Sequence, residues 1–249
     1  MPTREIPCAA SALTAVLVDS APFLLTEVAR TRLSVHYDTG RRRLPVLCVC
    51  TPEAIRLPNA VVSEELPPAR LVAGDGGFRA GQARWRVLRW WRPPAPRWLP
   101  VPDTLPEGAA ELTDDVLPGA RRPGPTYDGL DPLRLVGAGA GLTPAGDDVL
   151  AGALVAAHAT ADPRLAHWQH RTRVALTRRA TTAVSRGLLH AALDGYATPQ
   201  LARALEAVCR GGDTGAAIAA LLAVGHSSGA ALWHGATHTL QTRSSRRAA

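Results

Sequence analysis

The chain of 249 residues contains no lysine, only one methionine and only two phenylalanines. Arginine therefore carries every basic side-chain charge, and with abundant Ala, Gly and Pro this bias is typical of a GC-rich coding sequence. The formal net charge of +7 is compatible with an anionic ligand, an acidic protein partner or nucleic acid. Because the arginines are spread along the chain without forming an arginine-rich helix, the charge does not favour nucleic acid.

Cysteine is also scarce, with four residues at positions 8, 48, 50 and 209. Their spacing matches neither a CxxC zinc motif nor the disulfide framework of a small secreted domain. We therefore predict free, buried thiols in a reducing compartment. Cys48 and Cys50 lie on a predicted strand, where our interpretation places their side chains on opposite faces.

Long hydrophobic runs are missing as well. The N-terminus shows no apolar segment followed by a small-residue cleavage site, so we predict no signal peptide. Residues 214–242 carry no Asp, Glu or Arg. The apolar run within them breaks at Gly225–Gly229, short of the roughly 20 residues that a membrane span needs. A cytoplasmic protein without membrane contact is the expectation.

The two halves of the chain differ in pattern and predict an α+β fold, with an N-terminal β-rich subdomain and a C-terminal helical bundle. Residues 1–100 contain short extended segments in which Val35, Tyr37, Leu47 and Val49 suit strands. A short helix is predicted near residues 8–18. Residues 101–130, rich in Pro, Gly and Asp, are interpreted as a linker or an extended excursion.

Residues 131–242 are predicted to form the helical subdomain that carries the glycine-rich loops. Ala and Leu recur there at helical spacing. Residues 243–249 are predicted to be a disordered tail. The predicted helices cover 144–160, 163–194, 198–210 and 214–224, with a further helix after Gly229.

The stretch VGAGAGLTPAGDDVLAG, Val136 to Gly152, has the most unusual composition. Thr143 suits a helix N-cap and Pro144 the first helical position, while the negative charges of Asp147 and Asp148 suit the first turn. A capped helix explains these residues but not the glycines before them. Alternate glycines let backbone amides approach a ligand, and a helix N-terminus favours an anion. The glycine spacing and the position of the proline argue against a dinucleotide site.

Two later loops are candidates for chemistry. In CRGGDTGAA, Gly211 and Gly212 end one helix and Asp213 or Thr214 caps the next, which needs no function. In AVGHSSGAALWHG, Gly225 and Gly229 bracket His226, Ser227 and Ser228. A helix end followed by a serine cap would produce this pattern, but a histidine held between glycines can also transfer protons.

Three patterns in this order resemble the AllH-type family, which includes a subunit of oxamate carbamoyltransferase from purine (allantoin) breakdown. They are GAGAGLTPAGDDVLAG from Gly137, TAVSRGLLHAA from Thr182, and GHSSG from Gly225. Ala145 stands where we expect a serine in the family pattern. The resemblance covers the C-terminal half and implies phosphorolysis of oxalurate to oxamate and carbamoyl phosphate, or the reverse. It also implies partner subunits, one of them similar to acyl-CoA synthetases.

Chemistry then suggests a role for each residue of these patterns. Backbone amides at Gly139, Gly141 and after Thr143 would hold phosphate or carbamoyl oxygens, with Gly146 in the same anion-binding segment. Asp147 and Asp148 would orient the carbamoyl NH₂ or hold Mg²⁺. His226 would move a proton. Hydroxyls would contact the substrate and its carboxylate; they belong to Ser185, Ser227 and Ser228.

Two other functions stay open. One is a scaffold or regulatory subunit whose loops bind a metabolite without turning it over. The other is a Mg²⁺-dependent hydrolase similar to the ADP-ribosylglycohydrolases, which hold Mg²⁺ at GD-rich helix starts. In that case Asp147, Asp148 and Asp213 would be the metal ligands, although Gly215 stands where a further aspartate is expected.

Overall fold

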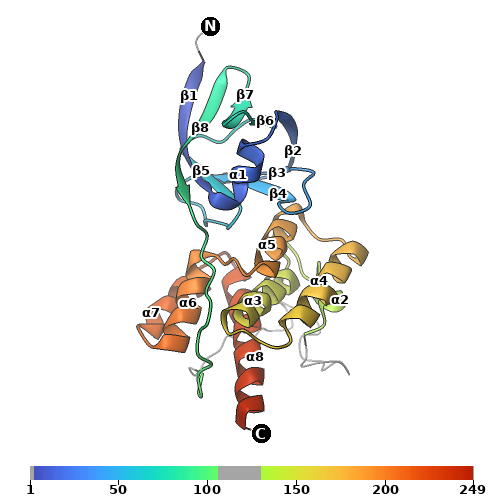
Figure 1. The fold of residues 1–249 in the computed structure, drawn as a ribbon, viewed down its shortest axis with the longest axis vertical. Helices are drawn as coiled ribbons and strands as arrows, with labels where there is room; N and C mark the ends of the chain where they lie inside the picture. The colour runs from blue at the N-terminus through green and yellow to red at the C-terminus, as the bar shows by residue number, and fades with distance from the viewer. Residues whose placement is uncertain (1–2, 106–129, 249) are drawn as a thin grey trace. The chain divides into compact units, whose positions relative to one another are not determined.

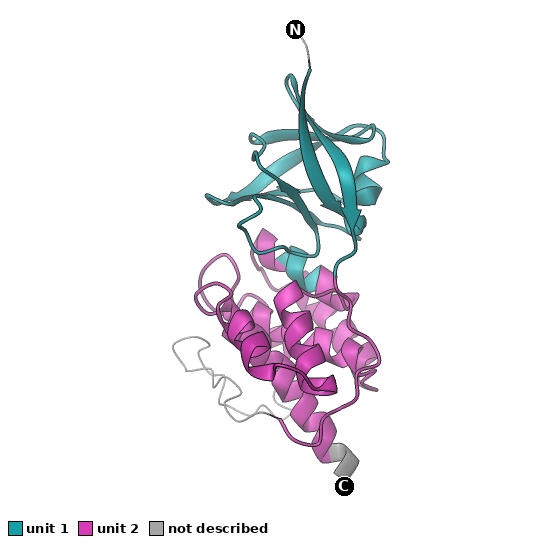
Figure 2. Ribbon diagram, turned by 90° about the vertical axis from the view of Figure 1, so that its left-hand side faces the viewer, with its two compact units in different colours: residues 1–93, 186–190 teal, residues 94–185, 191–249 magenta. Residues whose placement is uncertain are grey.

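A computed structural model describes residues 3–105 and 130–248 of the chain, with the backbone alone described for residues 246–248 (Figure 1). The predicted linker at 101–130 therefore lies mostly outside the described residues. By its internal contacts the chain divides into two compact units (Figure 2). Unit 1 comprises residues 1–93 and 186–190, and unit 2 comprises residues 94–185 and 191–249. The predicted α+β class is confirmed, with strands in the first part of the chain and helices in the second.

Unit 1 contains a closed eight-stranded barrel with the strand order β1-β5-β4-β3-β2-β6-β7-β8. Parallel pairing of β1 with β8 closes the barrel, β4 and β5 are also parallel, and the other neighbours are antiparallel. Closure leaves no strand edge exposed for pairing with another chain. The strands are β1 (Arg4–Ser11), β2 (Phe23–Arg30), β3 (Ser34–Asp38), β4 (Val46–Cys50), β5 (Ala60–Ser63), β6 (Arg70–Gly74), β7 (Gly77–Ala80) and β8 (Ala83–Trp91).

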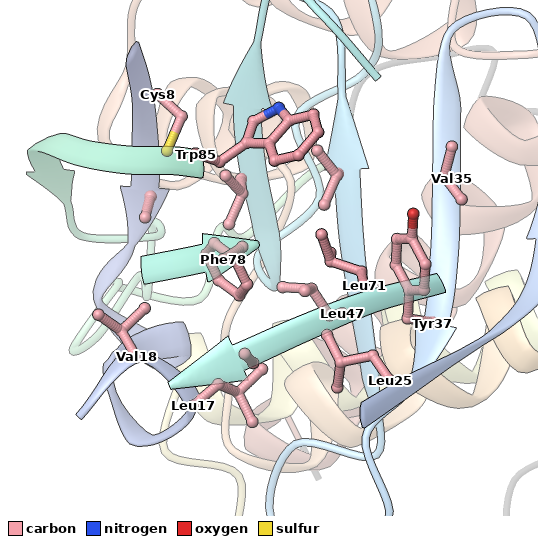
Figure 3. Close-up of a cluster of buried hydrophobic side chains, with 14 of the residues drawn as sticks. Cys8, Leu17, Val18, Leu25, Val35, Tyr37, Leu47, Leu71, Phe78 and Trp85 are labelled. Atoms are coloured by element: carbon pink, nitrogen blue, oxygen red, sulfur yellow. The ribbon is translucent and has the colours of Figure 1, made fainter. Parts of the chain in front are cut away.

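Large side chains fill the interior of the barrel (Figure 3). Trp85, Tyr37 and Phe78 are each at most 1% exposed, and Leu17 of the short helix α1 (Ala15–Val18) packs into the same cluster. The polar atoms of the Trp85 and Tyr37 side chains donate to backbone carbonyl groups, because buried polar atoms need hydrogen-bond partners. Trp85 Nε1 donates to the Glu65 carbonyl at 3.0 Å and Tyr37 Oη to the Pro68 carbonyl at 2.7 Å.

One prediction for this half is met only in part and another is wrong. The helix expected near residues 8–18 begins only after Ser11, because the β1 segment pairs on both sides and buries alternate residues. A 3₁₀ turn at Ala12–Thr14 and α1 follow it. Cys48 and Cys50 share one face of β4 and pack with Ala60, because strand residues two apart point the same way.

Unit 2 holds the helices from α2 onward, except for residues 186–190 of α5, which belong to unit 1. The break at 179–182 divides the single helix predicted over 163–194 into α4 and α5, because Arg179 is extended and the Thr182 hydroxyl caps a new helix. The helices are α2 (Pro132–Leu135), α3 (Ala145–Ala159), α4 (Leu165–Arg178), α5 (Ala183–Leu193), α6 (Pro199–Arg210), α7 (Thr214–Leu222) and α8 (Ser228–Ala248).

Helix α3 is the buried helix of this unit, since every residue in it except His158 is buried. It packs against α8 with the two backbones in close approach. A Cβ added to Gly152 would lie 1.9 Å from the Leu232 carbonyl oxygen, and one added to Gly235 would lie 1.8 Å from that of Val149. Only glycine fits at these two crossings.

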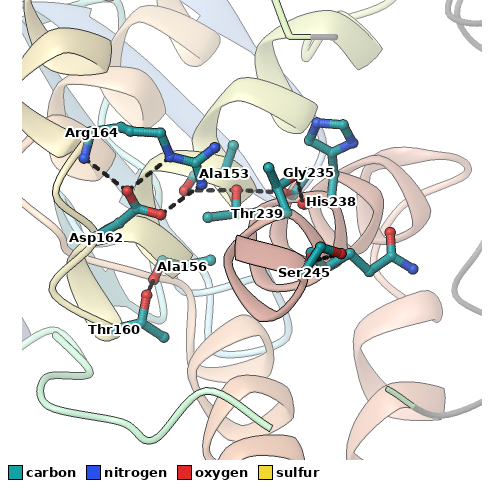
Figure 4. A network of polar contacts seen from close by, with 11 residues as sticks. Ala153, Ala156, Thr160, Asp162, Arg164, Gly235, His238, Thr239 and Ser245 are labelled. Atoms are coloured by element: carbon teal, nitrogen blue, oxygen red, sulfur yellow. Dashed lines mark hydrogen bonds and ion pairs between the residues drawn. The ribbon is translucent and has the colours of Figure 1, made fainter. Parts of the chain in front are cut away.

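Polar contacts reinforce this helix pair (Figure 4). Thr239 of α8 is completely buried, and its hydroxyl lies 3.0 Å from the Gly235 carbonyl oxygen and 3.4 Å from that of Ala153 on α3. After α3, the buried Asp162 carboxylate accepts from the Arg164 guanidinium at 2.7 Å and from the Arg164 amide at 2.8 Å. These bonds fix the turn that leads from α3 into α4.

The disordered tail predicted for 243–249 is also wrong over the described residues, because α8 continues to Ala248. The sequence after Gly235 contains neither glycine nor proline to end the helix. Among the described residues, no helix has the length and apolar character that crossing a membrane requires.

Candidate functional site

The glycine-rich loop lies between α2 and α3 in unit 2. Its three alternate glycines, Gly137, Gly139 and Gly141, all have a positive φ, of 74°, 111° and 91°. Side-chain-bearing residues avoid this conformation. The segment before the loop is the short helix α2, capped by Asp131. The loop is therefore a chain of turns between two helices.

The start of α3 differs from the prediction that Thr143 caps it. Pro144 occupies the N-cap position and supplies no side-chain hydrogen bond, so the helix begins at Ala145. The Thr143 hydroxyl lies 2.8 Å from the hydroxyl of Ser228, the first residue of α8. Asp147 and Asp148 do lie in the first turn, as predicted. Gly146 is buried, and its amide donates to the Ala138 carbonyl at 2.8 Å.

Asp147 is completely buried and both of its carboxylate oxygens have partners. Oδ1 accepts from the Gly137 amide at 2.9 Å, and Oδ2 accepts from the Thr181 hydroxyl. Burial raises the pKa of Asp147, while these bonds and the nearby Ser185 hydroxyl act in the opposite direction. The Ser185 hydroxyl is itself buried without a well-formed hydrogen bond to any described residue. Asp147 thus joins the loop, α3 and the segment before α5.

A second link joins the loop to α5. The Thr182 hydroxyl donates to the Leu142 carbonyl at 2.5 Å and accepts from the Ser185 amide at 3.1 Å, which makes it the N-cap of α5. Leu142 itself is 47% exposed. The pattern that begins with Thr182 therefore meets the glycine-rich loop directly.

Asp148 has different surroundings from its neighbour. It is 1% exposed, yet neither carboxyl oxygen has a hydrogen-bond partner among the described residues. Burial raises its pKa to about 7, and the negative charge of Asp147 adds to this shift. Hydrogen-bonding interactions with the Ser228 and Thr143 hydroxyls lower the pKa and so oppose this shift, and one of these two hydroxyls also donates to the other at 2.8 Å. The carboxyl group is therefore close to an even balance of its two protonation states at neutral pH.

Other predicted residues lie outside this cluster of contacts. His226 is exposed on the turn between α7 and α8, and the half-buried Ser227 uses its carbonyl to accept from the Ala231 amide. Asp213 is exposed and caps α7 through the Ala216 amide at 2.9 Å. No group of three or more His, Cys, Asp or Glu suited to a metal ion occurs among the described residues. The three aspartates considered as metal ligands do not form such a group.

The Thr181 hydroxyl and the pairing of Thr143 with Ser228 were not predicted. Thr181 precedes the second pattern by one residue, but no local signal relates it to Asp147, which lies 34 positions earlier. Thr143 and Ser228 are 85 positions apart. The three patterns thus meet at the glycine-rich loop and the first turn of α3, the second through Thr182 and Ser185 and the third through Ser228.

The loop can accept an anion. From Gly139 to Leu142 its residues are exposed, and no amide from Gly139 to Thr143 donates to another described residue. Free amides next to the N-terminus of a 15-residue helix present partial positive charge to solvent. The buried Asp148 carboxyl lies one turn further along the same helix.

Comparisons with known proteins match residues 135–240 to the family described as oxamate carbamoyltransferase subunit AllH. The resemblance inferred from the three patterns is thereby confirmed over this segment, which holds the loop, all five helices from α3 to α7 and most of α8. The match covers less than half of the chain and none of the barrel strands. No curated protein and no solved structure matches the chain.

Proposed function

We propose that this AllH-like chain is a subunit of a carbamoyltransferase that acts on oxamate, oxalurate or a related carbamoylated acid of allantoin breakdown. One observation carries the proposal: the three patterns of the matched segment meet at the glycine-rich loop and the adjoining first turn of α3, through the Thr182–Leu142 bond and the Thr143–Ser228 pair. Partner subunits of the same assembly would complete the enzyme, as the word subunit in the family description supports.

In this proposal the free amides from Gly139 to Thr143 bind the anionic part of the ligand, a phosphate or a carboxylate. This role is supported by the exposure of the loop, whose conformation depends on three glycines with a positive φ. Hydrogen-bond donors that are held in place before the reaction stabilise the negative charge that develops during acyl transfer. Asp147 keeps this loop in place by accepting the Gly137 amide.

The remaining roles are assigned by chemistry. Ser228 lies at the site and can reach a ligand carboxylate after breaking its bond to Thr143. His226 and Ser227 lie on the adjoining turn, where His226 is exposed and able to exchange protons with solvent or with a partner subunit. Mg²⁺, if the reaction uses it, would have to arrive with the phosphate ligand, because the described residues offer no cluster of ligands for it.

The test is thermal unfolding of the purified chain with carbamoyl phosphate, phosphate, oxamate or ADP-ribose, each with and without Mg²⁺. A ligand at about 100 times its Kd stabilises the folded state by roughly 2.7 kcal/mol. We expect stabilisation by carbamoyl phosphate or oxamate. Stabilisation by ADP-ribose with Mg²⁺ alone would contradict the proposal in favour of a hydrolase, and no stabilisation by any of the four would favour a scaffold.

A matched pair of variants locates the binding site. Gly141→Ala and Gly40→Ala each place a Cβ in open space at a positive φ, of 91° and 64° respectively. Both should lose stability by about 1–2 kcal/mol from backbone strain alone. We expect only Gly141→Ala to lose the ligand-induced stabilisation as well, because Gly40 lies in the barrel unit. Equal ligand responses in the two variants would move the binding site away from the loop.

A further inference from the structure

Asp147 and Asp148 occupy adjacent positions, but the structure gives them different capacities for binding. Asp147 has used both oxygens within the protein, on the Gly137 amide and the Thr181 hydroxyl. Asp148 has used neither, although it is as deeply buried. Buried carboxyl oxygens without a partner are rare in folded proteins because they lose their hydration without compensation. The oxygens of Asp148 are therefore available to a donor that comes from outside the protein.

The hydroxyls nearest to Asp148 mark the way to it. Thr143 and Ser228 are both half-buried, and Thr143 directly follows the exposed residues of the loop. One of the two hydroxyls donates to the other at 2.8 Å, and neither forms a well-formed hydrogen bond with the carboxyl, although both are close enough to lower its pKa. Rotation of the donating hydroxyl breaks this one bond. A small group that enters from the loop then meets the hydroxyls first and the carboxyl next.

The chemistry of the site indicates which kind of group can bind there. A carboxylate accepts hydrogen bonds, so its partner must carry N–H or O–H donors or be a cation. The described residues contain no group of three or more His, Cys, Asp or Glu that would hold a metal ion by themselves. Asp147, the nearest other carboxylate, is already engaged. The N–H and O–H donors of a ligand are therefore the partners considered for Asp148, and an amide NH₂ group is one of them.

We propose that Asp148 is the residue that recognises the NH₂ group of a primary amide whose anionic end lies on the amides of Gly139–Thr143. This inference rests on the proposed function and specifies its ligand as an amide-bearing anion. The first turn of α3 separates the loop from Asp148 by about 5 Å along the helix axis, a span that a ligand with few atoms can bridge. Asp147 is then a positioning residue that maintains the loop, and it does not contact the ligand.

Two pairs of ligands that differ only in the replacement of NH₂ by CH₃ test the proposal. Oxamate is compared with pyruvate, and carbamoyl phosphate with acetyl phosphate, by calorimetric titration of the full chain. At about pH 8.5 the Asp148 carboxyl, with a pKa of about 7, is mostly charged. Hydrogen bonds to a charged acceptor are strong, so at this pH we expect the NH₂ member of each pair to bind at least about tenfold more tightly. Equal affinities within both pairs would overturn the inference but leave the anion site, and hence the proposed function, standing.

Variants then assign the preference to one side chain. In Asp148→Ala the preference for NH₂ over CH₃ should fall to about onefold while pyruvate binds as before, whereas the exposed Asp213→Ala should retain the preference. Asp148→Asn keeps one acceptor oxygen and nearly the same shape, so it serves as the second variant if the alanine variant fails to fold. In Asp148→Asn we expect a reduced preference for NH₂ over CH₃. A preference unchanged in both Asp148 variants would overturn the inference, as would one that appears only with Mg²⁺. If none of the four ligands nor phosphate binds, the proposed function fails as well.

Discussion

Asp147 and Asp148 carry the same side chain at neighbouring positions, and burial raises the pKa of both. In Asp147 two hydrogen bonds from the protein oppose this effect of burial. Asp148 has no well-formed hydrogen bond of this kind; burial outweighs the opposing effect of the Ser228 and Thr143 hydroxyls, and its pKa rises from an ordinary value of 3.8 to about 7. A carboxyl group in this state makes the stability of the folded chain depend on pH.

The sign of this dependence follows from proton linkage. In the unfolded chain Asp148 loses its proton near about pH 4, whereas in the folded chain it keeps the proton up to about pH 7. The contribution of Asp148 to the stability of the folded chain is thus complete at low pH and is lost as the pH rises to about 7. Each unit of difference between the folded and unfolded pKa values corresponds to about 1.4 kcal/mol, so we expect the folded chain to lose a few kcal/mol of stability.

Asp148→Asn should remove most of this loss, because its side chain does not titrate. Urea unfolding at intervals from pH 4.5 to 8 measures the effect as a gain in stability of the variant relative to wild type with rising pH. Part of the pH dependence of stability should remain in the variant, because the pKa of Asp147 is raised as well. Asp213→Asn, at an exposed cap, serves as the control. Parallel pH profiles for wild type and Asp148→Asn would refute the assignment.

At the scale of elements, the close pairing of α3 with α8 holds the two halves of the site together. Asp148 belongs to α3, and Ser228 is the first residue of α8. The crossings at Gly152 and Gly235 bring the backbones too close for any side chain. The position of Ser228 relative to Asp148 therefore depends on these glycines as well as on the loop.

Gly235→Ala should destabilise the chain by at least about 2 kcal/mol, because its Cβ would lie 1.8 Å from the Val149 carbonyl oxygen and the helices would have to separate. Gly215→Ala is the matched control on α7, where the nearest atom to the added Cβ is the Asp213 carboxylate at 3.7 Å. Alanine is favoured over glycine in an exposed helix, so this control should gain about 0.5–1 kcal/mol. Chemical unfolding of both variants gives the comparison. A Gly235→Ala protein as stable as wild type would show that the helix pair adjusts freely.

Several elements could be predicted from the sequence because their signals are local. Periodicity located α3 at 144–160, close to its observed bounds of Ala145–Ala159, and Val35, Tyr37, Leu47 and Val49 all lie on buried strands. The errors arose where distant partners decide the outcome. Pairing of the β1 segment with β5 and β8 overrides the helical appearance of residues 8–11.

The candidate site shows the same limit. Glycine spacing indicated a loop with unusual backbone angles, and all three alternate glycines have a positive φ. The partners of Asp147 and Thr143 could not be predicted, because Thr181 and Ser228 lie 34 and 85 positions further along the chain. Adjacent aspartates look alike in a sequence, and only packing distinguishes the paired carboxylate from the unpaired one.

For the molecule as a whole, the four cysteines provide a probe of both units. Cys8, Cys48 and Cys50 belong to the barrel unit and Cys209 to the helical unit, and all four are buried and free of disulfides, as predicted. Burial raises the pKa of Cys8 to about 12 and that of Cys209 to about 11. Thiolates, which are the reactive form, are therefore scarce at neutral pH at these two positions.

We expect the native protein to react with an aromatic disulfide reagent at pH 8 only as fast as it unfolds, and four thiols to react at once in guanidinium chloride. Mass spectrometry of partly labelled protein then reports which unit opens first, through Cys209 or the three barrel cysteines. Rapid labelling of any cysteine under native conditions would contradict the burial described above.

The hydrogen bond between Thr143 and Ser228 has a consequence for the synthesis of the chain. A ribosome that has just released the glycine-rich loop and α3 still has to add the residues from α4 to the start of α8 before Ser228 exists. The barrel strands and the loop can be present on the nascent chain, but the site near Asp148 has to wait until the start of α8 is translated. Ligand binding can therefore assist only the late stages of folding, and a chain released early would carry the loop without its partner hydroxyl.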